Sequence, residues 1–276
     1  MEKLGFKLAT SHIQTRCMQL KPNRLLILLF SIFLIGCCNE PKLLNNGLTK
    51  KAIKITEYTI KVKTDSLNNQ IQDTLVITEN KYNENDQIIS RNQQNLFADG
   101  KIDIKYIYNE NKKIKREIVK LSNDSSNIYV DYFYKDTLLL KAHSENKNNI
   151  FHFKQIGEYE YNTDYTLKQV SLLQEYIDVE SNDTIMNTLE ISKYNDKELV
   201  TKSILSDLIK PERSRITKYD YDCGILMKIR KFNSKDSLIS KTEYKYEFDK
   251  FENWIKRESY ENNKLNYIRM REIEYK

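Results

Sequence analysis

The stretch Thr242-Glu243-Tyr244-Lys245-Tyr246-Glu247-Phe248 alternates aromatic or β-branched residues with charged ones. Its even-numbered residues would lie on one face of an extended chain and its charges on the other. Alternation of period two indicates a β-strand with one buried face, and Tyr and Thr suit such a half-buried surface. Residues 102–108 and 128–134 follow the same pattern. The sequence therefore predicts an all-β chain.

An aromatic residue followed by Asn, Asp or Lys ends each of these strands, and this marker recurs along the chain. The gaps between successive markers are 26, 26, 27, 33, 27, 27 and 27 residues. Regular spacing of this kind indicates a tandem structural repeat, and the one longer gap indicates a loop insertion of six residues. The markers are Tyr82, Tyr108, Tyr134, Tyr161, Tyr194, Tyr221, Phe248 and Tyr275.

A unit of about 27 residues has room for two strands and two turns. Asn, Asp and Gly after the markers, as in Asn83-Glu84-Asn85-Asp86, favour tight turns, and tight turns allow only antiparallel pairing. The prediction is an antiparallel meander of seven to eight β-hairpin repeats, about fifteen strands, forming an open, twisted or partly rolled sheet. Stacked tyrosine rings from neighbouring repeats should supply its core.

This arrangement resembles the YD/Rhs-type repeats, in which a Tyr-Asp pair precedes a turn glycine and an apolar residue. It looks closest to the short tyrosine-rich arrays on envelope lipoproteins of Bacteroidetes. The best match is residues 244–257, and the resemblance spans roughly residues 75–276. The motif is degenerate here, because four units replace the turn glycine, with Asp86, Lys112, Tyr165 and Glu252.

The front of the chain resembles a bacterial lipoprotein signal peptide. Leu34-Ile35-Gly36-Cys37 closes an apolar run, residues 25–33, that follows Lys21 and Arg24. The run is too short to cross a bilayer as a helix and fits the core of a signal peptide. The resemblance implies cleavage between Gly36 and Cys37 and acylation of Cys37, with either Met1 or Met18 as the start.

Three segments are thus predicted. Residues 1–36 are a lipoprotein signal peptide, residues 37–52 a lipidated cysteine and flexible tether, and residues 53–276 the tyrosine-rich β-repeat domain. Anchoring would place the protein in the cell envelope. Cys38 after the anchor, by analogy with lipoprotein sorting in enteric bacteria, favours the outer membrane.

The net charge argues against a nucleic-acid partner. The chain carries +6, but residues 1–36 hold five basic residues and one acidic residue, which leaves 40 basic and 38 acidic residues after cleavage. A nucleic-acid binder would keep a basic surplus on its folded domain.

Candidate chemistry is sparse. His143 and His152 lie nine residues apart, which is not metal-ligand spacing on a helix, although a hairpin could bring them together. Cys223 lies in a turn with no histidine close in sequence, so a nucleophile role lacks its base. The acid pairs Asp220/Asp222 and Glu272/Glu274 would each share a strand face, as paired catalytic carboxylates can, but charged outer faces carry such pairs routinely. Trp254, the only tryptophan, is equivalent to apolar strand positions and is expected in the core, the alternative being a platform on which a sugar ring stacks.

The leading functional hypothesis is a non-enzymatic, envelope-anchored lipoprotein whose β-repeat domain is a binding or scaffolding surface for an envelope protein or a glycan. No cofactor or metal is expected. One alternative is a carrier of a lipid or other apolar ligand, with the sheet curled over it. A second is a glycan-acting enzyme, which would need a cleft with paired carboxylates.

Overall fold

A computed structural model describes residues 48–276, except for 65, 67–68, 123–126 and 148–150. The described residues form sixteen strands and one short 3-10 helix, η1. Among them, no helix is both long and apolar enough to cross a bilayer. The elements are β1 (Ala52–Thr64), β2 (Gln70–Tyr82), β3 (Ile88–Asn95), β4 (Gly100–Tyr108), β5 (Ile114–Leu121), β6 (Asn127–Lys135), β7 (Leu138–Lys147), β8 (Phe151–Tyr161), β9 (Leu167–Asp178), β10 (Thr184–Tyr194), β11 (Val200–Asp207), η1 (Pro211–Arg213), β12 (Arg215–Asp222), β13 (Ile225–Asn233), β14 (Leu238–Phe248), β15 (Trp254–Glu261) and β16 (Lys264–Tyr275).

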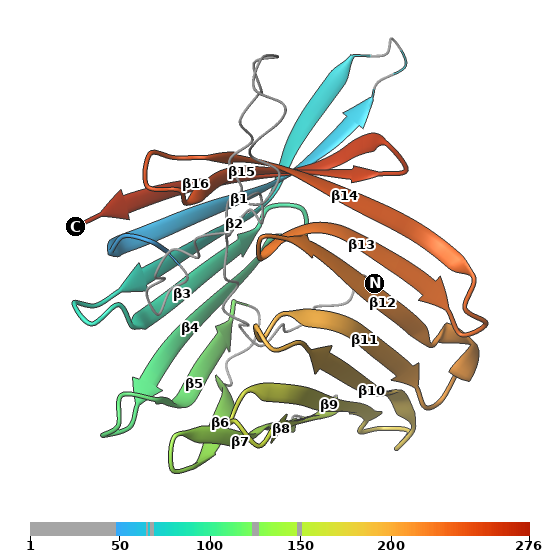
Figure 1. The fold of residues 1–276 in the computed structure, drawn as a ribbon. Coiled ribbons are helices and arrows are strands. Elements are labelled where there is room, and N and C mark those ends of the chain that lie inside the picture. The colour runs from blue at the N-terminus through green and yellow to red at the C-terminus, as the bar shows by residue number, and fades with distance from the viewer. Residues whose placement is uncertain (1–47, 65, 67–68, 123–126, 148–150) are drawn as a thin grey trace, which may run out of the picture.

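The strands close into a barrel. Each strand pairs antiparallel with its neighbours in the chain, and β1 also pairs with β16. Figure 1 shows the blue β1 beside the red β16, with the other strands following in chain order. The predicted all-β antiparallel meander of hairpins is confirmed. The predicted open or partly rolled sheet is wrong, because the two ends of the meander meet.

The repeat itself explains the closure. Seven of the markers pair with the start of the strand that follows them in the chain, as Tyr82 pairs with Ile88. The eighth marker, Tyr275, pairs instead with Ala52 at the start of β1. β1 thus pairs with β16 as the second strand of a hairpin would, and closure removes both free sheet edges.

A β-bulge accompanies every marker. The register between the two strands of a hairpin shifts immediately before the marker, as between Lys81 and Tyr82, and the seam has its own shift between Ala52 and Lys54. A bulge adds twist and bends its strand. Eight bulges at one end of the barrel therefore curve the sheet in the same sense. The further shifts lie at Ile107/Tyr108, Phe133/Tyr134, Glu160/Tyr161, Lys193/Tyr194, Asp220/Tyr221 and Glu247/Phe248.

The turns after the markers adopt the left-handed backbone conformation that glycine favours, although other residues occupy these positions. Asp86, Lys112, Tyr165 and Glu252 have φ values of 59°, 58°, 67° and 63°. This left-handed region costs an L-residue free energy. An Asn or Asp side chain at the start of the turn compensates by accepting backbone N–H groups, as Asn83 does from the amides of residues 85 and 87.

The marker face of the sheet is the interior of the barrel. Ile104, Val119 and Ile128 pair directly across three strands and are only 8%, 1% and 8% exposed. Directly paired residues share a face, and only the inner face of a closed barrel has other strands opposite it. The same alternation places all eight markers on this inner face.

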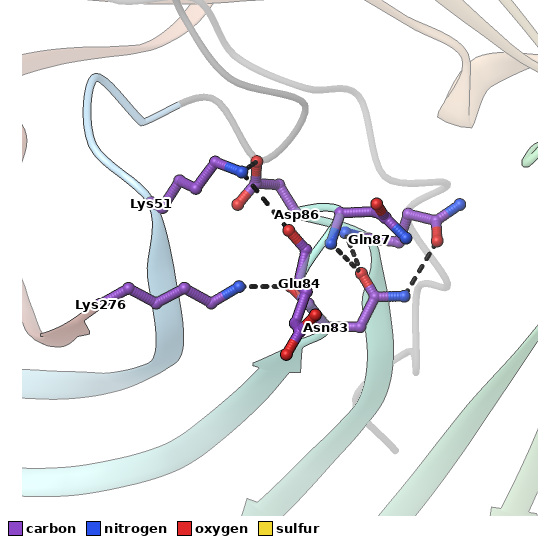
Figure 2. Close-up of polar contacts among 7 residues, drawn as sticks. Lys51, Asn83, Glu84, Asp86, Gln87 and Lys276 are labelled. Atoms are coloured by element: carbon purple, nitrogen blue, oxygen red, sulfur yellow. Dashed lines mark hydrogen bonds and ion pairs between the residues drawn. The ribbon is translucent and has the colours of Figure 1, made fainter.

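The seam between β1, β16 and the first marker turn is fixed by polar contacts (Figure 2). The Lys276 ammonium donates to the carbonyl of Asn83 at 3.0 Å, and the Lys51 ammonium lies 3.5 Å from an Asp86 carboxylate oxygen. The Lys51 ammonium also reaches the Glu84 carbonyl at 3.4 Å. Both ends of the barrel wall therefore hold the same turn.

An apolar cluster lies beside these contacts. Leu48 is 2% exposed and Ala52 is fully buried, and both pack with Ile55, Tyr82 and Tyr275. Residues 48–52, which the sequence analysis assigned to the flexible tether, thus belong to the barrel, because their apolar side chains fill its seam. The remaining 37–47 of that tether, and the predicted signal peptide 1–36, lie outside the described residues.

Candidate binding site in the barrel interior

A wall of arginines lines one side of the interior. Arg257 on β15 and Arg269 on β16 are direct cross-strand partners, and Arg269 also pairs with Thr59 of β1. Arg271 is two residues further along β16 and pairs with Glu57. Because paired residues share a face, all three guanidinium groups project from the same patch of the inner wall.

Within the described part of the chain, Glu57 is the one carboxylate that pairs with this patch. It accepts from Arg271 Nε at 2.9 Å and from Arg269 Nη1 at 3.3 Å. Burial by itself would raise the pKa of Glu57, but Arg271 and Arg269 together outweigh it and lower that pKa. Glu57 is therefore held as a carboxylate, and it neutralises only one of the three cations.

Aromatic rings surround the arginines. Trp254 is 6% exposed, and the Arg271 guanidinium lies 3.4 Å from the centroid of its ring. The Arg257 guanidinium lies 5.0 Å from the Tyr244 ring and 5.4 Å from the Trp254 ring. Such stacking holds a guanidinium by cation–π attraction. The prediction that Trp254 packs in the core is confirmed.

Burial and mutual repulsion act on the arginines together. Desolvation, followed by repulsion from Arg257, lowers the pKa of Arg269. Yet 42% of the Arg269 side chain and 25% of the Arg271 side chain remain exposed. Barrels of sixteen strands can enclose a water-filled channel. The exposed parts of these two arginines can therefore contact a solute inside the barrel.

The opposite side of the interior carries acids that have local partners. The Tyr132 hydroxyl donates to Glu117 at 2.8 Å, and the Ser203 hydroxyl donates to Glu190. Burial raises the pKa of Glu117. These acids lie on other strands than the three clustered arginines, which β15 and β16 carry.

Tyrosines of the inner face, most of them markers, join neighbouring hairpins. Desolvation raises the pKa values of Tyr108, Tyr134 and Tyr194 to about 12. Four tyrosine hydroxyls donate to a backbone carbonyl of the preceding hairpin, each on the residue opposite that hairpin's marker. The bonds are Tyr108 to Ile88 (2.7 Å), Tyr134 to Ile114 (2.9 Å), Tyr161 to Leu139 (3.0 Å) and Tyr246 to Leu226 (2.7 Å).

The outer face is charged all the way round the barrel. Every strand except β3 places at least one ionised side chain there, and β3 places Ser90, Asn92 and Gln94. On β14, four successive outward positions are Lys241, Glu243, Lys245 and Glu247. The other outward charges include Lys54, Glu79, Asp103, Arg116, Asp131, Lys141, Lys154, Glu175, Lys193, Lys202, Lys218, Arg230, Lys256 and Glu272.

The two histidines meet on this outer face. His152 Nε2 lies 2.7 Å from Glu145 Oε1, and His143 Nε2 lies 3.8 Å from Glu145 Oε2. The β7–β8 hairpin therefore brings them to one carboxylate, as the sequence allowed. Within the described part of the chain, no group of three or more His, Cys, Asp or Glu residues could hold a metal ion.

The acid pairs also lie outside the barrel, in contact with nearby polar groups. Arg230 Nη2 donates to Asp220 at 2.8 Å, and the Tyr58 hydroxyl donates to Glu272 at 3.1 Å. Glu274 pairs with Lys54. These contacts identify them as parts of a solvated ion-pair surface.

Cys223 lies with a φ of 47° between β12 and β13, in the turn where the sequence analysis placed it. The other cysteines of the chain, Cys17, Cys37 and Cys38, lie outside the described residues, as does the predicted cleavage position Gly36.

The sequence analysis missed the arginine wall, although part of its signal was present. Arg269 and Arg271 alternate in phase with the marker Tyr275, which places them on the inner face. Arg257 is three residues from the inward Trp254, and simple alternation would have put it outside. The bulge between Glu247 and Phe248 shifts the register and turns it inward.

Comparisons with known proteins support the fold. No family model matches this chain, and no curated protein does. The crystal structure of a porin-like protein from Bacteroides vulgatus is 12% identical, with a TM-score of 0.51, and the match covers 82% of this chain and 99% of that one. A porin-like protein from Bacteroides uniformis is 10% identical, with a TM-score of 0.49, over 81% and 96%. The first of these likenesses shows that the chain has a porin-like barrel fold.

Proposed function

We propose that this protein is a lipoprotein of the outer membrane whose barrel stands in water and binds a ligand in its interior without transforming it. The anchor would be the acylated Cys37. The protein would resemble porins in topology, while its contact with the membrane would come from lipid and not from the barrel wall.

The charged outer wall is the observation that carries this proposal. A membrane-spanning barrel presents an apolar band about 25 Å tall to the lipid. One Lys or Arg at the bilayer midplane costs such a barrel about 2–4 kcal/mol. Lys241, Glu243, Lys245 and Glu247 occupy four successive outward positions of one strand. A wall of this composition favours water on its outside.

The tether length supports the same arrangement. Eleven residue steps separate Cys37 from the buried Leu48 at the seam. An extended chain spans at most about 3.3–3.6 Å per residue, so the barrel would lie within roughly 40 Å of the bilayer. The marker turns contacted by residues 49–51 would face the membrane.

The interior supports a binding role. It contains the arginine wall, the buried Trp254 and half-buried tyrosines, which are the kinds of groups that orient a small ligand in a pocket. A glycan or the exposed part of an envelope protein would have to enter the barrel to reach them.

Detergent phase separation tests the anchoring. The expressed protein should incorporate a labelled fatty acid and partition into the detergent phase. The Cys37→Ser variant should lose the label and move to the aqueous phase with its β-sheet circular dichroism intact. Cys38→Ser is the matched control and should keep the label. A Cys37→Ser protein that stays in the detergent phase would show that the barrel wall itself binds lipid.

A further inference from the structure

The arginine wall has more positive charge than the protein neutralises. Three guanidinium groups share one patch of the inner wall, and among the described residues Glu57 is the carboxylate that pairs with Arg269 and Arg271. The acids of the neighbouring sequence do not help, because Glu258 and Glu272 alternate onto the outer face. The patch therefore carries an excess of about two positive charges.

The position of Arg257 makes this excess of positive charge costly to the fold. Arg257 and Arg269 are directly opposite each other on neighbouring strands. Like charges placed directly opposite destabilise a sheet. Among the described residues, Arg257 Nε is buried and has no hydrogen-bond partner, and a buried donor without a partner costs further free energy.

We propose that Arg257, Arg269 and Arg271 form a binding site for a multiply charged oxyanion, carried by a ligand that enters the barrel interior. A guanidinium presents paired N–H donors that match the oxygens of a carboxylate or a phosphate. An anion between Arg257 and Arg269 replaces their repulsion with attraction and supplies an acceptor for the buried Nε.

The aromatic rings beside the arginines indicate which class of ligand the site would bind. The Arg271 guanidinium covers the Trp254 ring, and Arg257 is within 5.4 Å of the same ring centroid. The rings hold the guanidinium groups in place, so little side-chain entropy is lost when an anion binds. The half-buried rings of Tyr244 and Tyr246 lie beside the arginines along β14. The site therefore fits a small molecule that carries a phosphate or several carboxylates on a ring. This assignment rests on the proposed binding role of the interior.

Trp254 provides the assay, because it is the only tryptophan in the chain. The full chain in detergent is titrated with pyrophosphate and with citrate, and Trp254 emission is followed; choline serves as a cationic control. A saturable change with at least one of the two anions, weakened as salt rises, is expected. The anion that binds tighter distinguishes a phosphate-bearing from a carboxylate-bearing ligand.

Two variants make the test specific. Arg257→Gln should weaken anion binding at least tenfold and should fold at least as stably as the parent, because it removes the repulsion with Arg269. Arg257→Lys should recover part of the affinity. Arg230→Gln, which removes an arginine of the outer wall, should bind like the parent. Anions should raise the melting temperature of the parent and of Arg230→Gln but not that of Arg257→Gln.

The proposal is overturned if neither anion gives a saturable change, or if Arg257→Gln binds as tightly as the parent. These outcomes are separate from the anchoring test, because they do not depend on Cys37 or on where the protein is located.

Discussion

The Tyr108 hydroxyl donates a 2.7 Å hydrogen bond to the backbone carbonyl of Ile88 and thereby joins two successive hairpins. Backbone pairing between β3 and β4 stops at Ser90, two residues short of Ile88. The strands separate beyond that point, and the tyrosine hydroxyl provides the bond that the ladder no longer makes. The same relationship recurs at Tyr134, Tyr161 and Tyr246.

Tyr108→Phe should therefore destabilise the barrel while leaving its shape intact. The change removes one hydroxyl and leaves the Ile88 carbonyl without this donor, which should cost about 1 kcal/mol. Urea unfolding followed by circular dichroism measures the loss. Tyr165→Phe is the matched control, because Tyr165 is 71% exposed in a turn, and its unfolding curve should overlay that of the parent.

The protein should lose stability at a lower alkaline pH than a sheet protein without buried tyrosines. Burial raises the pKa values of Tyr108, Tyr134 and Tyr194 to about 12, whereas tyrosines of the unfolded chain titrate near 10. The folded state keeps protons that the unfolded state releases, so this stability is fully present below pH 10 and is lost as pH rises from 10 towards 12. Thermal melts across this range should show a steep fall. Phenolate absorbance with a single midpoint near 10, in a protein that stays folded, would contradict the buried placement of these rings.

The seam should tolerate charge at one position and reject it at the next. Ala52 is fully buried and packs with Leu48 and Tyr275, while its neighbour Ile53, at the bulge of the seam, is 47% exposed. Ala52→Asp would bury an unpaired carboxylate and should cost several kcal/mol. Ile53→Asp should change the free energy of unfolding by less than about 0.5 kcal/mol. Equal effects of the two substitutions would mean that β1 does not close the barrel as described.

A glycine should stabilise the second marker turn. Lys112 has a φ of 58°, a conformation that an L-residue adopts at a cost of roughly 1–2 kcal/mol. Lys112→Gly removes that cost and should raise the free energy of unfolding by about 0.5–1 kcal/mol after the added entropy of the unfolded chain is subtracted. Lys113 does not have a left-handed backbone, so Lys113→Gly relieves no strain and should destabilise the protein. A destabilised Lys112→Gly variant would refute the strain argument.

The strands, their antiparallel pairing and the repeat could be predicted because they depend on local alternation. Marker residues such as Tyr134 lie on the inner face as the pattern requires. The repeat also anticipated the left-handed turns, since Asp86 and Glu252 stand where a glycine was expected.

The closure could not be read from the same pattern. It depends on Ala52 pairing with Tyr275, residues that are 223 positions apart, and no local signal distinguishes a long meander that closes from one that stays open. The strands of neighbouring repeats were expected to be joined by stacked rings, whereas the bonds that join them at Tyr108 and Tyr134 run from a hydroxyl to a carbonyl. The inward turn of Arg257 depends on a bulge, and a one-residue register shift reverses every face that follows it.

Residue-resolved amide hydrogen exchange along β1 tests the closed barrel most directly. Residues from Lys54 to Lys61 are paired with β2 on one side and with β16 on the other, so every amide in this segment should be protected, as in a central strand such as β9. In an open sheet β1 would be an edge strand. Protection at every second residue, with fast exchange between, would contradict the closure on which the interior binding site depends.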